Sequence, residues 1–297
     1  MTKDDAAKPY PASEQEQILR LSPDGRRFSA HAGRVGLVLL ACLALCALVP
    51  GRIAPYDPMA RVGKPLTRPS SDFWLGTNDI GQDILSELIW GTRISLSTGL
   101  TVAVLAVSIG IGVGLLSGYA SGLVGAILMR LADLTLVLPF LPLVILLSAY
   151  IGPGWSNIVG ILVLVSWAGP ARLVRSRVLS IMREPYIEAA QALGSSPWRV
   201  LRKHVWPGVR SIAVLQLILV ANASILAEAS LSFLGLGNPS AKSWGAMLYF
   251  ARVSGAFLGR AWQWWVLPTG LMISLSVLSL VLIGYALEHK LEPQIRA

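Results

Sequence analysis

Two acidic side chains lie in otherwise apolar parts of the sequence and are its first candidates for chemistry. They are Asp133 and Glu228, and a carboxylate inside a membrane is by default a candidate for proton relay or ion coupling. Asp133 follows Arg130 by three positions, however, which favours an ion pair on one helix face. Glu228 lies beside Ser230 and Ser232, which favours a hydrogen bond between helices. The structural interpretation is the simpler one for both acids.

No other group of side chains predicts catalysis. The three histidines, His31, His204 and His289, are widely separated and do not predict a metal site. Cys42 and Cys46 are four positions apart, which places them along one helix face and not in a disulfide framework. The sequence has no Gly-x4-Gly-Lys-Ser/Thr phosphate loop, so we expect no ATP or Mg²⁺ site and no other cofactor in this chain. Its energy supply has to come from elsewhere.

The amino-acid composition indicates that the chain lies mostly in a membrane. Of 297 residues, 54% are hydrophobic and 14% are charged, whereas roughly a quarter of an ordinary soluble chain is charged. A soluble enzyme is therefore excluded. The net charge of +9 would suit a nucleic-acid partner, but the basic residues lie between apolar stretches, as they do in membrane proteins.

The uncharged stretches predict an all-α membrane protein with six transmembrane helices. About 20 apolar residues cross a bilayer, so the intervals 94–129 and 134–171 are too long for one crossing each, and helix-breaking segments divide them at 117–122 and 151–157. We predict helices at residues 34–50, 94–117, 124–149, 156–174, 210–236 and 264–287. Residues 1–33 are expected to form a mostly disordered tail, 34–287 the transmembrane domain and 288–297 a short C-terminal tail.

The distribution of basic residues predicts the orientation in the membrane. If both termini are cytoplasmic, 17 of the 25 Lys and Arg residues lie inside, as the positive-inside rule requires. Segment 51–93 is then extracytoplasmic, and its apolar run 84–90 predicts a short helix lying on the membrane surface. Loop 175–210 is cytoplasmic.

Aromatic and small residues predict contacts at the membrane surface and between helices. Four tryptophans are interpreted as anchors at the outer interface: Trp155, Trp262, Trp264 and Trp265. Four glycines lie in the second predicted helix: Gly110, Gly112, Gly114 and Gly118. Glycines let helix backbones approach closely, so we expect this helix to pack tightly, either against a partner subunit or along a translocation path, with packing favoured.

The cytoplasmic loop predicts a helical hairpin. Pro185 ends the preceding helix, and residues 186–193 are strong helix formers that close on Gly194, a residue suited to the left-handed position after a helix. Ser196 and Pro197 then fit the cap and first position of a second helix, which Pro207 ends. Such a basic hairpin fits two roles, contact with anionic lipid or docking of another protein.

The residues of this hairpin resemble a family motif. The pattern Glu188-Ala189-Ala190, three residues, Gly194, and then Val205-Trp206-Pro207 is similar to the EAA motif of the inner-membrane permease subunits of binding-protein-dependent ABC transporters. This chain has Trp206 where leucine is usual and Gly208 where asparagine is frequent.

Three further stretches extend the resemblance over residues 34–293. Residues 73–83 look like the segment before the second helix in the dipeptide, oligopeptide and nickel branch of these permeases, with Gln82 where arginine is usual. Residues 227–237, followed by 243–245, are similar to the branch's motif after the loop, and Glu292-Pro293 stands where Asp-Pro is common. Within the branch the chain resembles the second, C-type permease.

The resemblance implies a MetI-like type I importer fold in a bacterial cytoplasmic membrane. It implies four kinds of partner: a homologous permease as heterodimer partner, two ATPase subunits that bind ATP and Mg²⁺, an extracytoplasmic substrate-binding protein that contacts 51–93, and membrane lipid. The helix at 186–194 is expected to seat in a groove of the ATPase, with Glu188, Ala189, Ala190, Gly194 and Pro207 as coupling residues. Di- or oligopeptides are the first expectation for cargo, although nickel-chelate, opine and glutathione systems share the pattern.

Two other classes of protein remain as alternatives. An ion-coupled secondary carrier would use Asp133 and Glu228 as coupling sites, but such carriers tend to show internal repeats, and no convincing repeat is present. A membrane enzyme is least favoured, because the sequence offers no paired acid and base and no set of metal ligands. Arg130, Asp133 and Glu228 remain structural or gating candidates.

Overall fold

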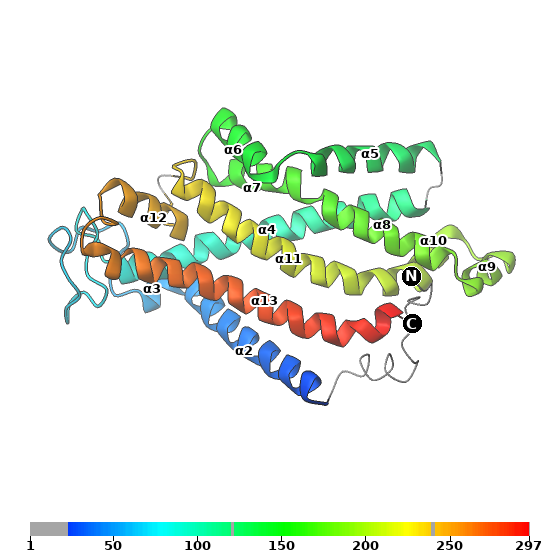
Figure 1. The fold of residues 1–297 in the computed structure, drawn as a ribbon, viewed down its shortest axis with the longest axis horizontal. Coiled ribbons are helices and arrows are strands. Elements are labelled where there is room, and N and C mark those ends of the chain that lie inside the picture. Colours follow the sequence, from blue (N-terminus) through cyan, green and yellow to red (C-terminus); the bar gives the residue numbers. More distant parts are fainter. Residues whose placement is uncertain (1–22, 120–121, 239–240, 297) are drawn as a thin grey trace, which may run out of the picture.

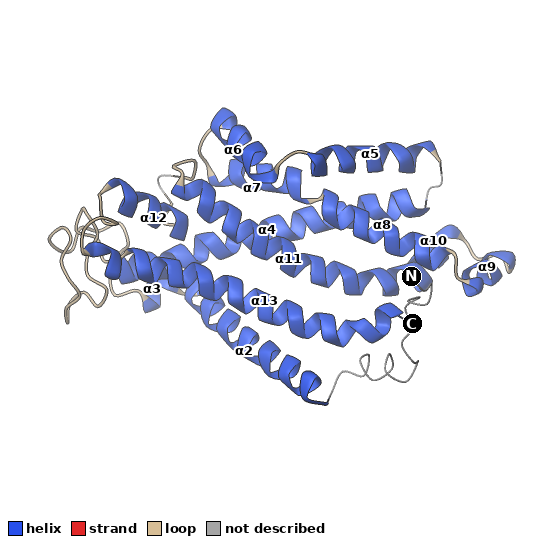
Figure 2. Ribbon diagram, viewed as in Figure 1, coloured by secondary structure: helices blue, strands red, loops and turns tan. Residues whose placement is uncertain are grey.

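The computed structural model describes residues 23–119, 122–238 and 241–296, and these residues form an elongated bundle of helices (Figures 1 and 2). The long helices are α2 (Pro23–Leu48), α4 (Ile84–Tyr119), α5 (Leu123–Val137), α6 (Phe140–Ile151), α7 (Trp155–Ser166), α8 (Ala168–Met182), α11 (Trp206–Phe233) and α13 (Val266–Arg296). The shorter ones are α3 (Pro50–Ile53), α9 (Pro185–Ala192), α10 (Pro197–Val200), a π-helical turn (Leu201–Val205), α12 (Trp244–Val253) and a 3₁₀ turn (Ala261–Gln263).

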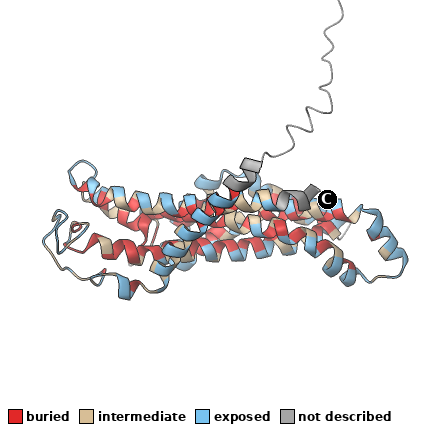
Figure 3. Ribbon diagram, turned by 90° about the horizontal axis from the view of Figure 1, so that it is seen from below, coloured by how far each residue is buried: buried red, intermediate tan, exposed pale blue. Residues whose placement is uncertain are grey.

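The bundle has two distinct ends. Residues 54–83 and α12 lie at one end, which we call the loop end, and α9 and α10 project from the other, which we call the hairpin end (Figure 1). Buried residues run along the centre of the bundle between these ends, whereas the tip of the hairpin is largely exposed (Figure 3). The long helices thus form the body that separates the loop end from the hairpin end.

The number of membrane spans agrees with the sequence prediction, but one span is broken. Five helical segments are long and apolar enough to cross a membrane, and α5 with α6 makes a sixth if this bent pair counts as one span. The two helices meet at an angle of 90°, so the predicted continuous helix at 124–149 is wrong. Leu138 is extended with ψ 135° before Pro139, because a proline disfavours helical geometry in the residue before it.

Several helices are longer than predicted. α4 has 36 residues and begins at Ile84, so residues 84–90 continue into a long helix and the predicted surface helix there is wrong. α2 begins at Pro23, inside the predicted N-terminal tail, and α13 continues to Arg296 through most of the predicted C-terminal tail. The rest of the predicted N-terminal tail, residues 1–22, lies outside the described residues.

Glycines fix the contact between α4 and α8 within this one chain. A Cβ atom on Gly110 would lie 2.7 Å from Cβ of Pro170, and one on Gly114 would lie 2.6 Å from Cβ of Val174. Gly118 meets α8 in the same way, whereas a Cβ on Gly112 would meet nothing within 4 Å. The prediction of tight packing is confirmed for three of the four glycines, and their partner helix belongs to the same chain.

Two of the four tryptophans are not interface anchors. Trp264 and Trp265 are buried, the second completely, because they lie in the turn just before α13 and pack into the main apolar core. Trp262 and Trp155 remain partly exposed, and the indole Nε1 of Trp155 donates a hydrogen bond of 2.8 Å to Oγ1 of Thr98. The anchor interpretation is therefore wrong for Trp264 and Trp265, which belong to the core of the loop end.

Candidate functional site

The hairpin turns on Gly194, as the sequence predicts. Its φ is +80°, a left-handed backbone conformation that glycine adopts at little cost. The amide of Gly194 donates to the carbonyl of Gln191 at 2.9 Å, and the amide of Ser195 donates to that of Ala190 at 3.0 Å. These two bonds form a Schellman motif, which satisfies the last carbonyls of a helix and ends α9 sharply after the Glu188-Ala189-Ala190 sequence.

One side chain anchors α9 to the rest of the molecule. Ile187 is fully buried in an apolar cluster at the foot of the long helices, whose other buried members are Val174, Val178, Ile181, Val200, Val205 and Val209. The ring of Tyr186 also lies 5.7 Å from that of His204. Helix α9 is thus packed against both α8 and the second arm of the hairpin.

The opposite face of α9 is open. Glu188, Ala189 and Gly194 are exposed, Ala190 is half-buried, and the large apolar side chain of Leu193 is 88% exposed. In the second arm the Trp198 side chain is 69% exposed. Exposed large apolar residues rimmed by polar ones mark contact surfaces for proteins or membranes. The hairpin therefore presents a preformed contact surface at the end of the bundle.

The second arm of the hairpin does not end at Pro207. Residues Pro197–Phe233 form one helical segment of 37 residues, about 55 Å long at the rise of an α-helix. A π-helical turn precedes Pro207, and the amide of Trp206 bonds to the carbonyl of Leu201, five residues back. This extra residue accommodates a proline that would otherwise break the helix. Ser196 occupies the cap position and Pro197 the first turn, as predicted, although the side chain of Ser196 makes no capping hydrogen bond.

The same helix carries Glu228 near its other end, where the predicted hydrogen bond between helices is confirmed. Glu228 is buried, and its Oε2 accepts a hydrogen bond of 3.2 Å from Oγ of Ser95 on α4. Its Oε1 accepts one of 2.7 Å from Oγ of Ser232. Oγ of Ser95 in turn accepts the backbone amide of Trp244 at 3.3 Å, so the carboxyl group of Glu228 ties α11 to α4 and to the start of α12.

Asp133 does not pair with Arg130. It forms an ion pair with Arg172 of α8, and both side chains are about half exposed, at 43% and 57%. The prediction of a pair within one helix is wrong because the bend after α5 lays this helix alongside α8, which supplies the nearer guanidinium. Within the described ranges, no three His, Cys, Asp or Glu side chains are grouped as a metal site requires.

Sequence reasoning missed a buried ion pair at the loop end. Lys242 forms an ion pair with Glu87, whose side chain is 2% exposed. Nδ2 of Asn78 donates to Oε1 of Glu87 at 3.0 Å, and Nζ of Lys242 donates to Oε1 of Gln82 at 2.6 Å. Residues of segment 73–83, Glu87 and Lys242 therefore meet in one polar cluster. Lys242 directly precedes the motif at 243–245, and no signal in the sequence places it near segment 73–83.

Comparison with known proteins places this architecture in a family. The family described as the inner membrane component of binding-protein-dependent transport systems matches residues 110–297. The chain belongs to this family. The matched region contains the hairpin, Glu228 and Lys242, whereas Glu87 and residues 73–83 precede it.

Curated relatives in this permease family cover nearly the whole chain. The di/tripeptide transport system permease protein DppC of Pseudomonas aeruginosa is 37% identical over 91% of this chain and 90% of its own length. The glutathione transport system permease protein GsiD of Pectobacterium atrosepticum is 35% identical over 92% and 89%. The oligopeptide transport system permease protein OppC of Bacillus subtilis is 33% identical over 88% and 85%. This permease is thus a multi-pass inner-membrane component of an ABC transport system.

Proposed function

We propose that this permease forms the translocation path of an ATP-driven importer together with a homologous permease. Two separate ATPase subunits would bind ATP and Mg²⁺ and dock on the hairpin, and an extracytoplasmic substrate-binding protein would dock on the loop end. Both termini and the hairpin would then lie in the cytoplasm, in agreement with the positive-inside distribution of Lys and Arg.

The hairpin is the observation that carries this proposal. Its open face exposes Glu188, Ala189, Leu193 and Trp198, whereas Ile187 on the other face is fully buried and fixes α9 to the long helices. Contact with anionic lipid alone would require basic side chains, but it would not require the buried contact that Ile187 makes. Firm packing of α9 is required if an ATPase is to move the bundle, because a displacement of α9 is then transmitted to α8 and α11.

The coupling mechanism follows from the continuity of the second arm. Closure of the paired ATPases displaces α9, and the 37-residue helix from Pro197 to Phe233 carries the displacement along the bundle to Glu228. At that point the helix is bonded to α4 and adjoins α12, so its shift changes contacts at the loop end. The bundle is thereby biased between an inward-open and an outward-open arrangement.

Short peptides are the cargo that the comparisons favour. The relatives described above carry names for di- and tripeptide, oligopeptide and glutathione transport, and glutathione is itself a tripeptide. All three names therefore describe the transport of peptides, and a short peptide is the cargo that fits all of them. Nickel chelates and opines, which other systems of this branch carry, have no counterpart among those three names.

Reconstitution tests the proposal against a secondary carrier. The complex of both permeases, the ATPases and the binding protein is placed in proteoliposomes, and peptide uptake is measured with ATP hydrolysis and the proton gradient abolished in turn. We expect uptake to stop without hydrolysis and to survive without the gradient. Uptake that persists without hydrolysis and stops without the gradient would instead establish an ion-coupled carrier that uses Asp133 and Glu228.

A further inference from the structure

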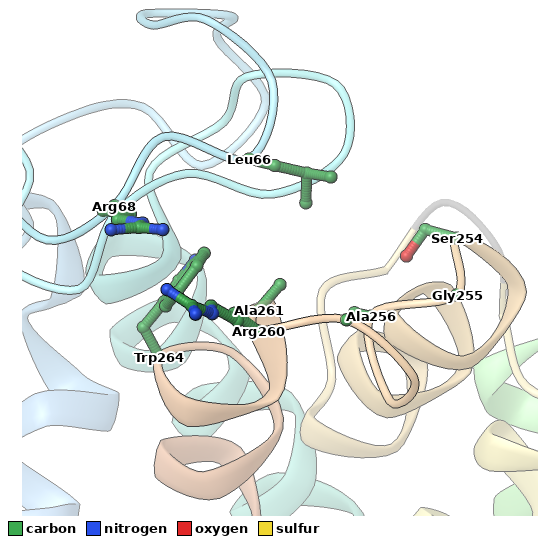
Figure 4. Close-up of a pocket in the computed structure, with 9 residues that line it drawn as sticks. Leu66, Arg68, Ser254, Gly255, Ala256, Arg260, Ala261 and Trp264 are labelled. Carbon is green, nitrogen blue, oxygen red and sulfur yellow. The ribbon is translucent and has the colours of Figure 1, made fainter.

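A small cavity opens at the loop end between two segments that are distant in the sequence. Its volume is about 260 Å³, and it lies between the turn at Leu66 and Arg68 and the connection from α12 to α13, which contributes Arg260 and Trp264 (Figure 4). It lies apart from the hairpin and from the Glu228 cluster, and neither of those sites accounts for it.

The charged residues that line this cavity are all basic. Two of its nine lining residues are arginines, and none of the nine is acidic. The side chains of Arg68 and Arg260 are exposed, and neither forms an ion pair with an acid in the part of the chain that the structure describes. Two guanidinium groups that share a cavity without a counter-charge favour an anionic group between them.

Two further features of the wall indicate a ligand. The indole Nε1 of Trp264 is buried and has no hydrogen-bond acceptor among the described residues, although buried donors are normally paired. Leu66 has φ +52° and is the one non-glycine residue with positive φ in the described ranges. Strained backbone of this kind concentrates at ligand clamps and active sites. Its amide is held by the carbonyl of Asn78 at 2.9 Å, so the polar cluster around Glu87 supports the strained turn.

We propose that the cavity receives the carboxylate of an acidic side chain on the extracytoplasmic substrate-binding protein. The inference rests on the proposed function, because it takes the loop end to be the docking side. A guanidinium group binds a carboxylate through two parallel hydrogen bonds. The cavity is smaller than the roughly 300–1,000 Å³ of pockets that enclose whole ligands, so a single side chain fits it better than a peptide cargo.

A carboxylate in this position would also bridge two parts of the permease. Arg68 belongs to segment 54–83, whereas Arg260 precedes α13, so one bound acid links the long outer segment to the start of the last helix. Docking of the binding protein would therefore restrict movement at the loop end. This is the end of the bundle to which the displacement of α9 would be transmitted.

Charge reversal tests the inference in the complete complex. The affinity of the binding protein, loaded with alanyl-alanine, is measured for complexes in nanodiscs that carry Arg68→Glu, Arg260→Glu or Arg61→Glu. Arg61 is exposed in the same segment but lies outside the cavity, so its variant controls for net charge. Size-exclusion chromatography verifies that each variant complex is intact, which the exposure of all three side chains favours.

We expect Arg68→Glu and Arg260→Glu each to weaken binding at least tenfold, and Arg61→Glu to weaken it less than threefold. Replacing the exposed acids of the binding protein by lysine, one at a time, should yield one variant that restores binding to the Arg260→Glu complex. Unchanged affinity in both cavity variants, or an equal loss in Arg61→Glu, would overturn the inference.

Two controls separate the possible failures. If the C-terminal amide of alanyl-alanine reproduces the loss of affinity in the unsubstituted complex, the cargo carboxylate occupies the cavity and the assignment to the binding protein is wrong. If the unsubstituted complex shows no ATP-dependent uptake with its binding protein, the proposed function fails. If the unsubstituted complex takes up peptide normally and both cavity variants still bind the binding protein as tightly, the proposed function stands and only the role of the cavity is rejected.

Discussion

At Gly194 the function of the hairpin depends on a backbone conformation. The residue has φ +80°, and a Cβ atom would meet nothing within 4 Å. A larger residue therefore has space, and its cost would come from the left-handed conformation alone, about 1–2 kcal/mol. The local Schellman motif sets the exit angle of α9, so this one residue controls how the exposed face is presented.

Substitution of Gly194 is predicted to uncouple ATP hydrolysis from transport. In the Gly194→Leu variant we expect a several-fold loss of peptide uptake per ATP hydrolysed, because the turn relaxes and α9 no longer fits its docking groove. Gly194→Asn should retain most of the activity, since asparagine tolerates the left-handed region. Uptake and hydrolysis are measured together in proteoliposomes. Equal activity of the leucine variant and the unsubstituted protein would contradict the assignment of the turn.

Glu228 is predicted to act as a hydrogen-bond acceptor and not as a proton carrier. Glu228→Gln keeps one acceptor oxygen for a serine hydroxyl, and its NH2 group can donate to the other hydroxyl, so we expect uptake to remain within a few-fold of normal. Glu228→Leu leaves both buried hydroxyls without their acceptor, and each such group costs about 1–3 kcal/mol, so the thermal unfolding midpoint should fall. A glutamine variant that is well folded yet inactive would favour the relay.

Local sequence patterns predicted the hairpin, but they did not predict contacts between residues that are far apart in the sequence. Pro185, Gly194 and Pro197 mark helix ends through their own backbone preferences, which need no knowledge of the fold. Glu87 and Lys242 are 155 residues apart, and nothing in the pattern of either segment pairs them. Asp133 was assigned to the wrong arginine for the same reason, because a neighbour in sequence was the only partner that could be named.

Among the helices, the broken pair α5 and α6 departs most from the sequence prediction. Hydropathy alone predicted one span at 124–149, since both halves are largely apolar and Arg130 and Asp133 are the only charged residues in that range. The bend at Leu138 comes from Pro139, a signal that was present in the sequence but was outweighed by the continuous hydropathy. The length of α4 was underestimated for the opposite reason: Glu87 and Arg93 are charged, yet the helix continues through both of them.

The glycine contact of α4 with α8 makes a prediction at the level of helix packing. Gly114→Ala places a Cβ 2.6 Å from that of Val174 and 2.8 Å from the carbonyl oxygen of Ala171, and such overpacking costs typically about 1–3 kcal/mol. We expect a lower thermal unfolding midpoint in detergent. Gly112→Ala is the matched control, because its Cβ meets nothing within 4 Å and alanine favours helix by about 0.5–1 kcal/mol over glycine. Equal midpoints for both variants would reject the close contact.

The two ion pairs that join distant segments are predicted to differ strongly in their contribution to stability. Lys242→Met leaves the buried carboxyl group of Glu87 without its partner, a change that costs about 3–5 kcal/mol. Arg172→Met breaks the half-exposed pair with Asp133 and should cost about 0–1 kcal/mol. Thermal unfolding of the two variants measures the difference, and the double variant Lys242→Met/Glu87→Leu should recover part of the loss. A larger effect at Arg172 would reverse this ranking.

For the whole molecule, the separation of the two ends predicts a sidedness that can be measured. Trp74 at the loop end is 71% exposed and Leu193 at the hairpin end is 88% exposed. In a background with Cys42→Ser and Cys46→Ser, a membrane-impermeant thiol reagent should label Trp74→Cys in spheroplasts. It should label Leu193→Cys only after the cells are opened. The reverse pattern would invert the proposed orientation.

The pairing of the first and last long helices has a consequence for biogenesis. A Cβ on Gly33 of α2 would lie 2.6 Å from Cβ of Ala286, and one on Gly36 would lie 2.7 Å from the carbonyl oxygen of Ser279, both on α13. Helix α2 therefore packs against a helix that leaves the ribosome only after all the other described helices. Until α13 has been synthesised, this glycine face of α2 stays without its partner in the bilayer, where an insertion chaperone or a membrane protease can recognise it.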